Sequence, residues 1–68
     1  MKEVRLLGDK IKQIRISKKL TREQFAIETG IARSYIYRIE QGTSNPSIKA
    51  LVQIAQTFNV SVKSLIEF

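Results

Sequence analysis

Four polar residues near the middle of the chain have the types and the spacing needed to recognise DNA bases. Arg33, Ser34, Tyr37 and Arg38 fall on one side of a helix with 100° between successive residues, with Arg33 at the edge of that side. Arginine can bind O6 and N7 of guanine through two parallel hydrogen bonds, and serine suits several bases. Tyrosine can donate to a phosphate or pack against a thymine methyl group. These four residues form the candidate base-reading set; the alternative is an ordinary solvated helix face.

The surrounding segment predicts two helices that would position this set. From residue 22 to residue 41 the chain reads REQFAIETGIARSYIYRIEQ, and apolar residues recur at helical spacing on both sides of Gly30. Glycine at such a break allows the left-handed backbone with which many helices end. The pattern is typical of a helix-turn-helix, whose second helix can enter the DNA major groove. Two exposed tyrosines, Tyr35 and Tyr37, would be unusual on a merely solvated face.

Two groups of residues beside the second helix are candidates for binding DNA phosphates. Thr21 is suited to cap the first helix of the pair, and Arg22 follows in its first turn, where free N–H groups attract anions. Thr43, Ser44 and Asn45 form the loop after the second helix and offer hydroxyl, amide and backbone donors. The alternatives are a solvent-facing arginine at the first position and plain turn chemistry at the second.

Arg15 and Glu40 are predicted to form a structural ion pair. Each flanks an apolar stripe, Arg15 on a helix over residues 2–18 and Glu40 on the helix over residues 33–41. Such a pair would tie the base-reading helix to the rest of the fold. The alternative is a weak pair at the surface, which contributes little to stability.

Helical periodicity and capping residues predict an all-α fold for the whole chain. Helices are expected over residues 2–18, 21–30, 33–41, 47–59 and 61–66, with short connections and no strand pattern. The sequence therefore predicts a single compact domain over residues 1–68. The expected core consists of Leu7, Ile11, Ile14, Leu20, Phe25, Ala26, Ile31, Ile36, Ile39, Leu51, Ile54, Phe58 and Leu65.

The composition excludes several classes of function. The chain of 68 residues has no cysteine and no histidine, so it lacks thiolate and imidazole ligands and the commonest general base. No triad, metal site, cofactor site or acid–base pair can be found, which makes an enzyme the least favoured reading. No apolar run is long enough to span a bilayer, and the expected location is the cytoplasm, in association with the nucleoid. The net charge of +6 favours a polyanionic partner, with nucleic acid ahead of an anionic membrane surface.

Taken together, the motifs resemble the Cro and phage-repressor helix-turn-helix family, also called the XRE family. The resemblance runs from Leu7 to Leu65. It rests on Ile14-Arg15, Leu20-Thr21, Phe25-Ala26, Gly30-Ile31, Arg33-Ser34-Tyr35-Ile36, Arg38-Ile39-Glu40-Gln41-Gly42, Asn45-Pro46-Ser47 and Val60-Ser61.

The resemblance implies a five-helix, lambda-repressor-like domain that binds palindromic operator DNA as a homodimer. It also implies base contacts from the candidate base-reading set and phosphate contacts from Arg22 and the loop over residues 43–45. Family members of this length resemble restriction-modification controller proteins, small repressors or antitoxins. An antitoxin or another protein-interaction module, with a toxin or RNA polymerase as its protein partner, is the alternative function.

Leftover apolar residues at the C-terminus are the candidate dimer interface. Val62, Ile66 and Phe68 cannot all face so small a core, and a self-complementary patch could join two copies. The alternative is that Phe68 folds back onto the first helix. Two departures from the family pattern stand out elsewhere: Ala32 replaces a usual capping Ser or Thr, and Arg22 replaces a frequent Gln.

Overall fold

The protein consists of five α-helices joined by short loops. The computed structural model describes residues 1–68 and contains no strand, which confirms the predicted all-α fold. The helices begin and end within a few residues of the predicted positions: α1 Lys2–Ser17, α2 Arg22–Thr29, α3 Arg33–Gln41, α4 Ile48–Phe58 and α5 Val62–Leu65. None of them has both the length and the apolar character needed to cross a membrane.

Local hydrogen bonds explain where α2 begins and how the chain turns into α3. The Thr21 hydroxyl accepts from the Gln24 N–H at 3.1 Å, and the Gln24 side chain accepts from the Thr21 N–H at 2.8 Å. This reciprocal pair is a capping box in which Thr21 is the predicted cap. At the other end, Gly30 has a φ of 76°, in the left-handed region that glycine tolerates. The buried Thr29 hydroxyl donates to the Phe25 carbonyl and accepts from the Ile31 N–H, so this polar residue is fully bonded inside the turn.

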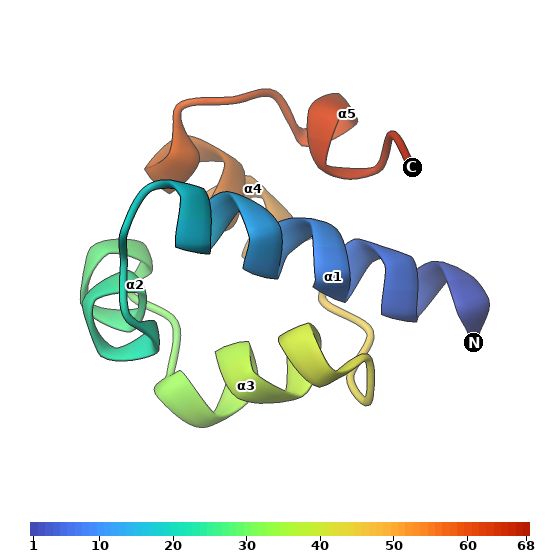
Figure 1. The fold of residues 1–68 in the computed structure, drawn as a ribbon, viewed down its shortest axis with the longest axis horizontal. Helices are drawn as coiled ribbons and strands as arrows, with labels where there is room; N and C mark the ends of the chain where they lie inside the picture. The colour runs from blue at the N-terminus through green and yellow to red at the C-terminus, as the bar shows by residue number, and fades with distance from the viewer.

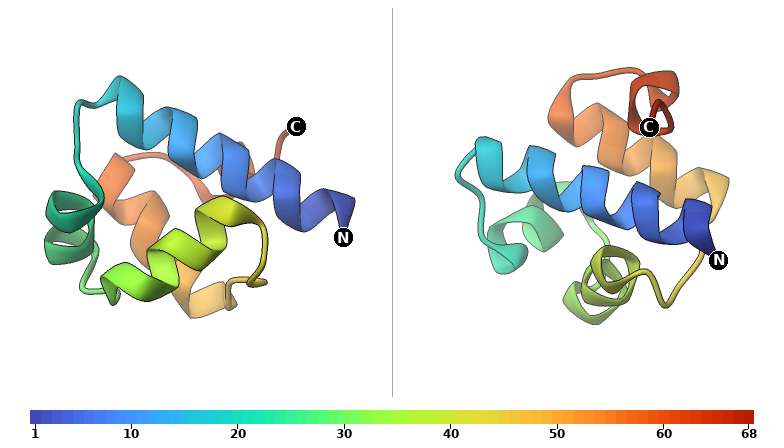
Figure 2. Two further views of the ribbon diagram at one scale, coloured as in Figure 1. Left: turned by 60° about the horizontal axis from the view of Figure 1, so that its bottom comes forward. Right: turned by 45° about the vertical axis from the view of Figure 1, so that its right-hand side comes forward.

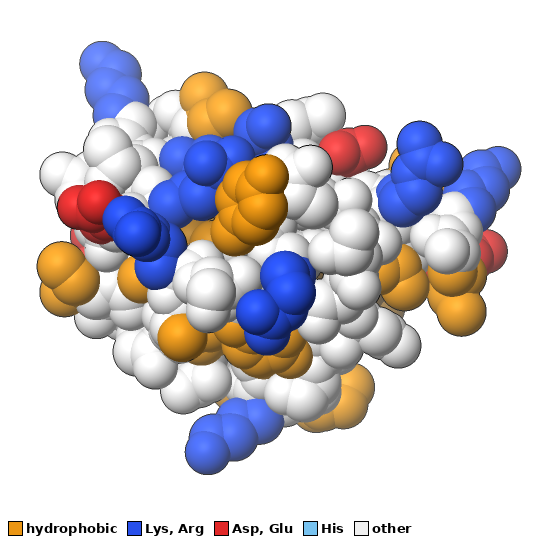
Figure 3. Space-filling model, turned by 90° about the horizontal axis from the view of Figure 1, so that it is seen from below, with side chains coloured by type: hydrophobic (Ala, Val, Ile, Leu, Met, Phe, Trp, Pro, Cys, Tyr) orange, Lys and Arg blue, Asp and Glu red, His pale blue; other side chains and the backbone are white.

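Helix α1 is the longest helix and packs against both α3 and α5. Figure 1 shows α3 running beneath it and α5 above it, and both helices contact α1. The left view of Figure 2 places α4 behind α3 and on the same side of α1 as α2 and α3. Helix α3 therefore forms an outer face of the protein, which Figure 3 shows from below.

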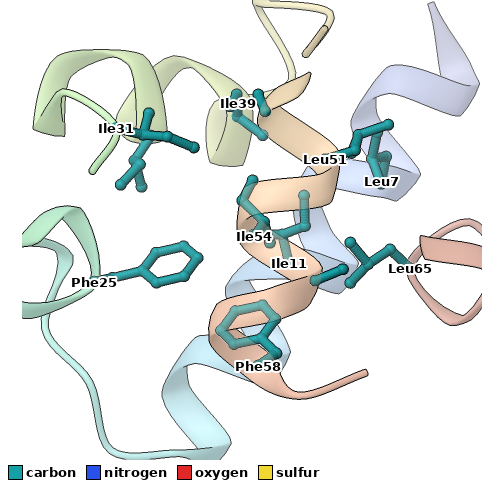
Figure 4. Packing of buried hydrophobic residues seen from close by; sticks show 12 residues of the cluster. Leu7, Ile11, Phe25, Ile31, Ile39, Leu51, Ile54, Phe58 and Leu65 are labelled. Atoms are coloured by element: carbon teal, nitrogen blue, oxygen red, sulfur yellow. The ribbon is translucent and has the colours of Figure 1, made fainter. Parts of the chain in front are cut away.

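All five helices contribute to one apolar core, and Figure 4 shows how its side chains converge on α4. The rings of Phe25 and Phe58 stack with centroids 4.8 Å apart. Three predicted core residues, Ile14, Leu20 and Ala26, are only partly buried, because they pack against the rim of the cluster. The buried cluster is Leu7, Ile11, Phe25, Ile31, Ile36, Ile39, Ala50, Leu51, Ile54, Ala55, Phe58 and Leu65.

A glycine on α1 permits the close approach of α1 to α3. Gly8 is buried, and a Cβ atom built on it would collide with the carbonyl oxygen of Ile39 and lie 3.2 Å from that of Glu40. These oxygens belong to the α3 backbone, which cannot rotate away as a side chain would. Gly8 therefore determines how tightly α3 is held, a role that the sequence analysis did not assign to it.

Replacing Gly8→Ala should lower the free energy of unfolding by about 1–3 kcal/mol, the usual cost of overpacking a core. Alanine favours a helix over glycine by only about 1 kcal/mol, so the collision should decide the sign. Urea denaturation followed by circular dichroism measures the change. The matched control is Gln13→Ala at an exposed position of α1, which should stay within about 0.5 kcal/mol of the parent. A Gly8→Ala protein as stable as the parent would mean that α1 and α3 can separate freely.

Candidate nucleic-acid interface

The four candidate base-reading residues are exposed together on the outer face of α3. Arg33, Ser34 and Arg38 are exposed, and Tyr37 keeps 49% of its surface accessible. Seen from this side, basic side chains are spread across the middle of the face and acidic ones lie toward its margins (Figure 3). The polar side of α3 faces outward because Ile36 and Ile39 are buried on its opposite side.

The structure brings this set together with one of the two phosphate-binding candidates. An open hollow of about 920 Å³ lies beside α3, and Arg15 and Glu23 complete its lining. We call it the α3 hollow. The other residues that line it were all assigned to the site from the sequence: Thr21, Arg22, Arg33, Ser34, Tyr37 and Arg38.

The second phosphate-binding candidate does not line the α3 hollow. The loop over residues 43–45 follows the C-terminus of α3, where Gly42 has a φ of 76°. The Thr43 hydroxyl donates to the Arg38 carbonyl at 3.2 Å, and the Thr43 N–H donates to the same oxygen at 3.0 Å. The loop is therefore fixed to the last turn of α3.

Glu40 is buried and paired with two arginines. Its side chain has no exposed surface, and its Oε2 accepts from Arg15 Nε at 2.7 Å. Its Oε1 accepts from Arg15 Nη2 at 3.2 Å and from Arg22 Nε at 3.1 Å. Arg15 also donates from Nη1 to the Leu20 carbonyl at 2.7 Å. The predicted Arg15–Glu40 pair is present, and it joins α1 to α3 inside the protein rather than at the surface.

Sequence reasoning missed the second partner of Glu40. Arg22 was interpreted as a free phosphate ligand or a solvated side chain, whereas its side chain is only 34% exposed and is paired with Glu40. Its Cζ atom also lies 5.0 Å from the centre of the Tyr37 ring. This distance is typical of a cation–π contact, which requires about 6 Å or less. No local signal could have revealed either contact, because α2 and α3 meet only in the folded chain.

Tyr35 differs from the expectation that both tyrosines of α3 are exposed. It is half-buried against the core, and its hydroxyl accepts from the Ser47 N–H at 3.1 Å. The guanidinium of Arg38 lies 5.6 Å from the centre of its ring. The exposure of Tyr35 was predicted wrongly because the chain after α3 returns along this side of the helix and covers the ring.

An acidic residue, Glu23, approaches the face from α2. Its carboxylate accepts from Arg33 Nη1 at 2.6 Å, and both side chains are more than half exposed. Exposed pairs of this kind contribute only about 0–1 kcal/mol, so DNA could displace Glu23 from Arg33 at little cost.

The structure holds no cluster of three or more acidic, histidine or cysteine side chains that could bind a metal ion.

The candidate dimer residues at the C-terminus are divided between the core and the surface. Val62 is partly buried against the core, whereas Ile66 and Phe68 are 50% and 51% exposed. The start of α5 is capped, since the Ser61 hydroxyl accepts from the Ser64 N–H at 3.2 Å. Ile66 and Phe68 therefore form an exposed apolar pair that does not belong to the core.

Known proteins resemble this chain in both sequence and structure. A family model described as Helix-turn-helix matches residues 11–65. The control protein C.BamHI of Bacillus amyloliquefaciens is 40% identical over 64 residues, which cover 93% of this chain and 79% of that protein.

Two solved structures extend the likeness to the fold. The restriction-modification controller protein C.AhdI from Aeromonas hydrophila has a TM-score of 0.92 at 25% identity, covering 96% of this chain and 98% of the other. SinR, a master regulator for biofilm formation solved in complex with DNA, has a TM-score of 0.86 at 35% identity, covering 90% and 98%.

Removing the Glu40 carboxylate or the Arg15 guanidinium should destabilise the fold strongly. Each of Glu40→Ala and Arg15→Ala leaves a buried charge without its partner, and the expected loss in unfolding free energy is about 3–5 kcal/mol. The double variant should lose clearly less than the sum of the two. Chemical denaturation of the four proteins gives the coupling energy, and strictly additive losses would show that the two side chains do not stabilise each other.

Proposed function

The chain belongs to the XRE-type helix-turn-helix family, and from this premise we propose that it is a sequence-specific DNA-binding transcriptional regulator. Its likeness to C.BamHI and C.AhdI favours a regulator of the restriction-modification controller type. The observation that carries the proposal is the α3 hollow. It joins the exposed polar face of α3 to the start of α2 in one surface that offers several donors and little negative charge.

In this proposal α3 lies in the major groove and each exposed side chain has a defined task. Arg33 and Arg38 bind guanines, Ser34 bonds to a neighbouring base edge, and Tyr37 packs against a thymine methyl or donates to a phosphate. Arg38 rests on the Tyr35 ring, which limits the positions that its guanidinium can take. Restricting a side chain before binding reduces the entropy lost when DNA is bound.

We propose that two groups of phosphate contacts set the register of α3. Thr21 and Arg22 bind the backbone from the start of α2, and the loop over residues 43–45 binds it from the end of α3. Phosphate contacts from two different elements would fix the orientation of the protein on the duplex. The net charge of +6 adds a salt-dependent attraction for any DNA sequence.

The proposed functional unit is a homodimer that contacts a palindromic operator. Ile66 and Phe68 form the centre of its interface, because they are apolar side chains left exposed after the end of α5. Val62 contributes from the edge of the core. Such a regulator would act at the nucleoid, in the cytoplasm, and RNA polymerase is the protein partner expected of an activator.

Selection from a random pool of duplexes at near-physiological salt should enrich a palindrome with half-sites about 34–36 Å apart, one helical turn, or a multiple of that distance. Enrichment establishes both dimeric recognition and the operator. Weak, salt-sensitive binding without any enrichment would reject sequence-specific regulation. It would favour the alternative of a protein-interaction module, such as an antitoxin.

Replacing Arg38→Ala should weaken binding to the selected operator by about 1–3 kcal/mol and relax the preference at one base position. The matched control is Arg38→Lys, which keeps the charge but cannot form two parallel hydrogen bonds to guanine. It should recover part of the affinity without the preference. Fluorescence anisotropy with the operator and its single-base variants measures both effects. An equal loss for every duplex would show that Arg38 contacts only the backbone.

Replacing Phe68→Ser should weaken dimerisation at least about tenfold, since burying a phenylalanine contributes about 1.5–3 kcal/mol. Sedimentation equilibrium without DNA measures the dimer dissociation constant. The matched control is Ile27→Ser on α2, because Ile27 is even more exposed, at 82%, and lies outside the proposed interface. An unchanged dimer in the Phe68 variant, or a monomeric parent protein, would refute this interface.

A further inference from the structure

Arg22 is the one side chain that contacts both the buried ion-pair network and the exposed face of α3. Its Nε donates to Glu40 at 3.1 Å, while its guanidinium covers the Tyr37 ring with Cζ 5.0 Å from the ring centre. The two terminal nitrogens make no hydrogen bond within the protein, and the side chain opens on the α3 hollow. The Nε atom of Arg22 is thus held by Glu40, the guanidinium plane lies on Tyr37, and the two terminal nitrogens are free to bind a ligand.

We propose that Arg22 is a positioning residue that couples the binding of a DNA phosphate to the reading of a base by Tyr37. This inference rests on the function proposed above and adds a specificity role for a residue of α2. The phosphate binds the terminal nitrogens of Arg22, and the flat guanidinium holds the Tyr37 ring against rotation. A contact with the backbone therefore improves discrimination between bases, although Arg22 itself touches no base.

The buried end of the network explains why Arg22 can hold the ring. Glu40 has no exposed surface, and two bonds from Arg15 fix its carboxylate in place. Arg22 therefore bonds to an acceptor that cannot move with solvent. Because Nε takes this bond, the plane of the guanidinium is set by the core of the protein and not by the DNA.

The geometry of the other charged groups supports the assignment to Arg22. Arg33 lines the same hollow, but its guanidinium pairs with Glu23 at 2.6 Å. Arg38 lies over Tyr35, 5.6 Å from the centre of that ring. Tyr37 is thus held by a residue of another helix, whereas Tyr35 is covered by a residue of its own helix. Movement of α2 relative to α3 would therefore change how Tyr37 is held and leave the cover over Tyr35 in place.

Replacing Arg22 by lysine or by glutamine tests separately the positive charge and the planar shape of its guanidinium. Lysine keeps the positive charge and can bind a phosphate, but it has no flat group to lie on the ring. Glutamine keeps a hydrogen-bonding planar amide but has no charge. If Arg22 served only as a phosphate ligand, lysine would replace it with little effect on which bases are preferred.

The test is a random-pool selection performed in parallel with the parent, Tyr37→Ala, Arg22→Lys and Arg22→Gln proteins. Binding constants are then measured for the selected duplex and its single-base variants. In Tyr37→Ala, the positions that lose preference define the bases read by Tyr37. We expect Arg22→Lys to lose roughly 2- to 30-fold in discrimination at those same positions, the range of a cation–π contact. Discrimination elsewhere, and the slope of affinity against salt, should stay unchanged.

A double-mutant comparison completes the test. Tyr37→Ala should cost less discrimination when lysine already occupies position 22, because the ring is then no longer held. Thermal unfolding of every variant shows that the fold is kept, and the spectrum of the Tyr37 ring protons in free Arg22→Lys should change toward that of a mobile ring.

The possible failures can be told apart. If the parent protein selects no palindrome, the proposed function fails and this inference fails with it. A parent that selects a palindrome, combined with an Arg22→Lys protein of unaltered discrimination, overturns the coupling and leaves the regulator intact. A uniform loss for all duplexes, or a Tyr37→Ala protein with unchanged preferences, also overturns it.

Discussion

The buried carboxylate of Glu40 is the constraint on which the arrangement of α3 depends. A carboxylate without exposed surface is costly unless it is paired and hydrogen-bonded, and Glu40 is bonded to Arg15 of α1 and Arg22 of α2. Three helices therefore meet at one side chain of α3. Because Gly8 also lets the α1 backbone contact that of α3, the orientation of α3 is determined from its buried side.

Because α3 is fixed from its buried side, the side chains on its exposed face are also restricted in position. Two tyrosines on the helix each lie beneath an arginine, Tyr37 beneath Arg22 and Tyr35 beneath Arg38. The hydroxyl of Tyr35 is further bonded to the start of α4. Flexible cationic side chains that would otherwise sample many rotamers are thereby restricted before any ligand arrives. A surface prepared in this way loses less conformational entropy on binding, and this favours specificity over general attraction to charge.

Much of this arrangement could be predicted from the sequence because its causes are local. Apolar spacing and caps such as Thr21, Gly30 and Ser61 depend on neighbours within a few residues, and they placed every helix correctly. The extent of burial along α4 was harder to predict, and Ala50 and Ala55 were missed. They are buried because the core side chains of the other helices pack around α4, which no pattern within α4 expresses.

The sequence by itself determined the all-α fold, the outward side of α3 and the charge that it carries, because helical periodicity converts residue order directly into faces. Only the tertiary structure decided which charges pair. Glu40 accepts from Arg22 as well as Arg15, and Arg22 then covers Tyr37, since these groups come together only where α2 packs against α3. These residues are far apart in the sequence, and no sequence pattern indicates that they touch. Their contact arises from the packing of helices around a shared core.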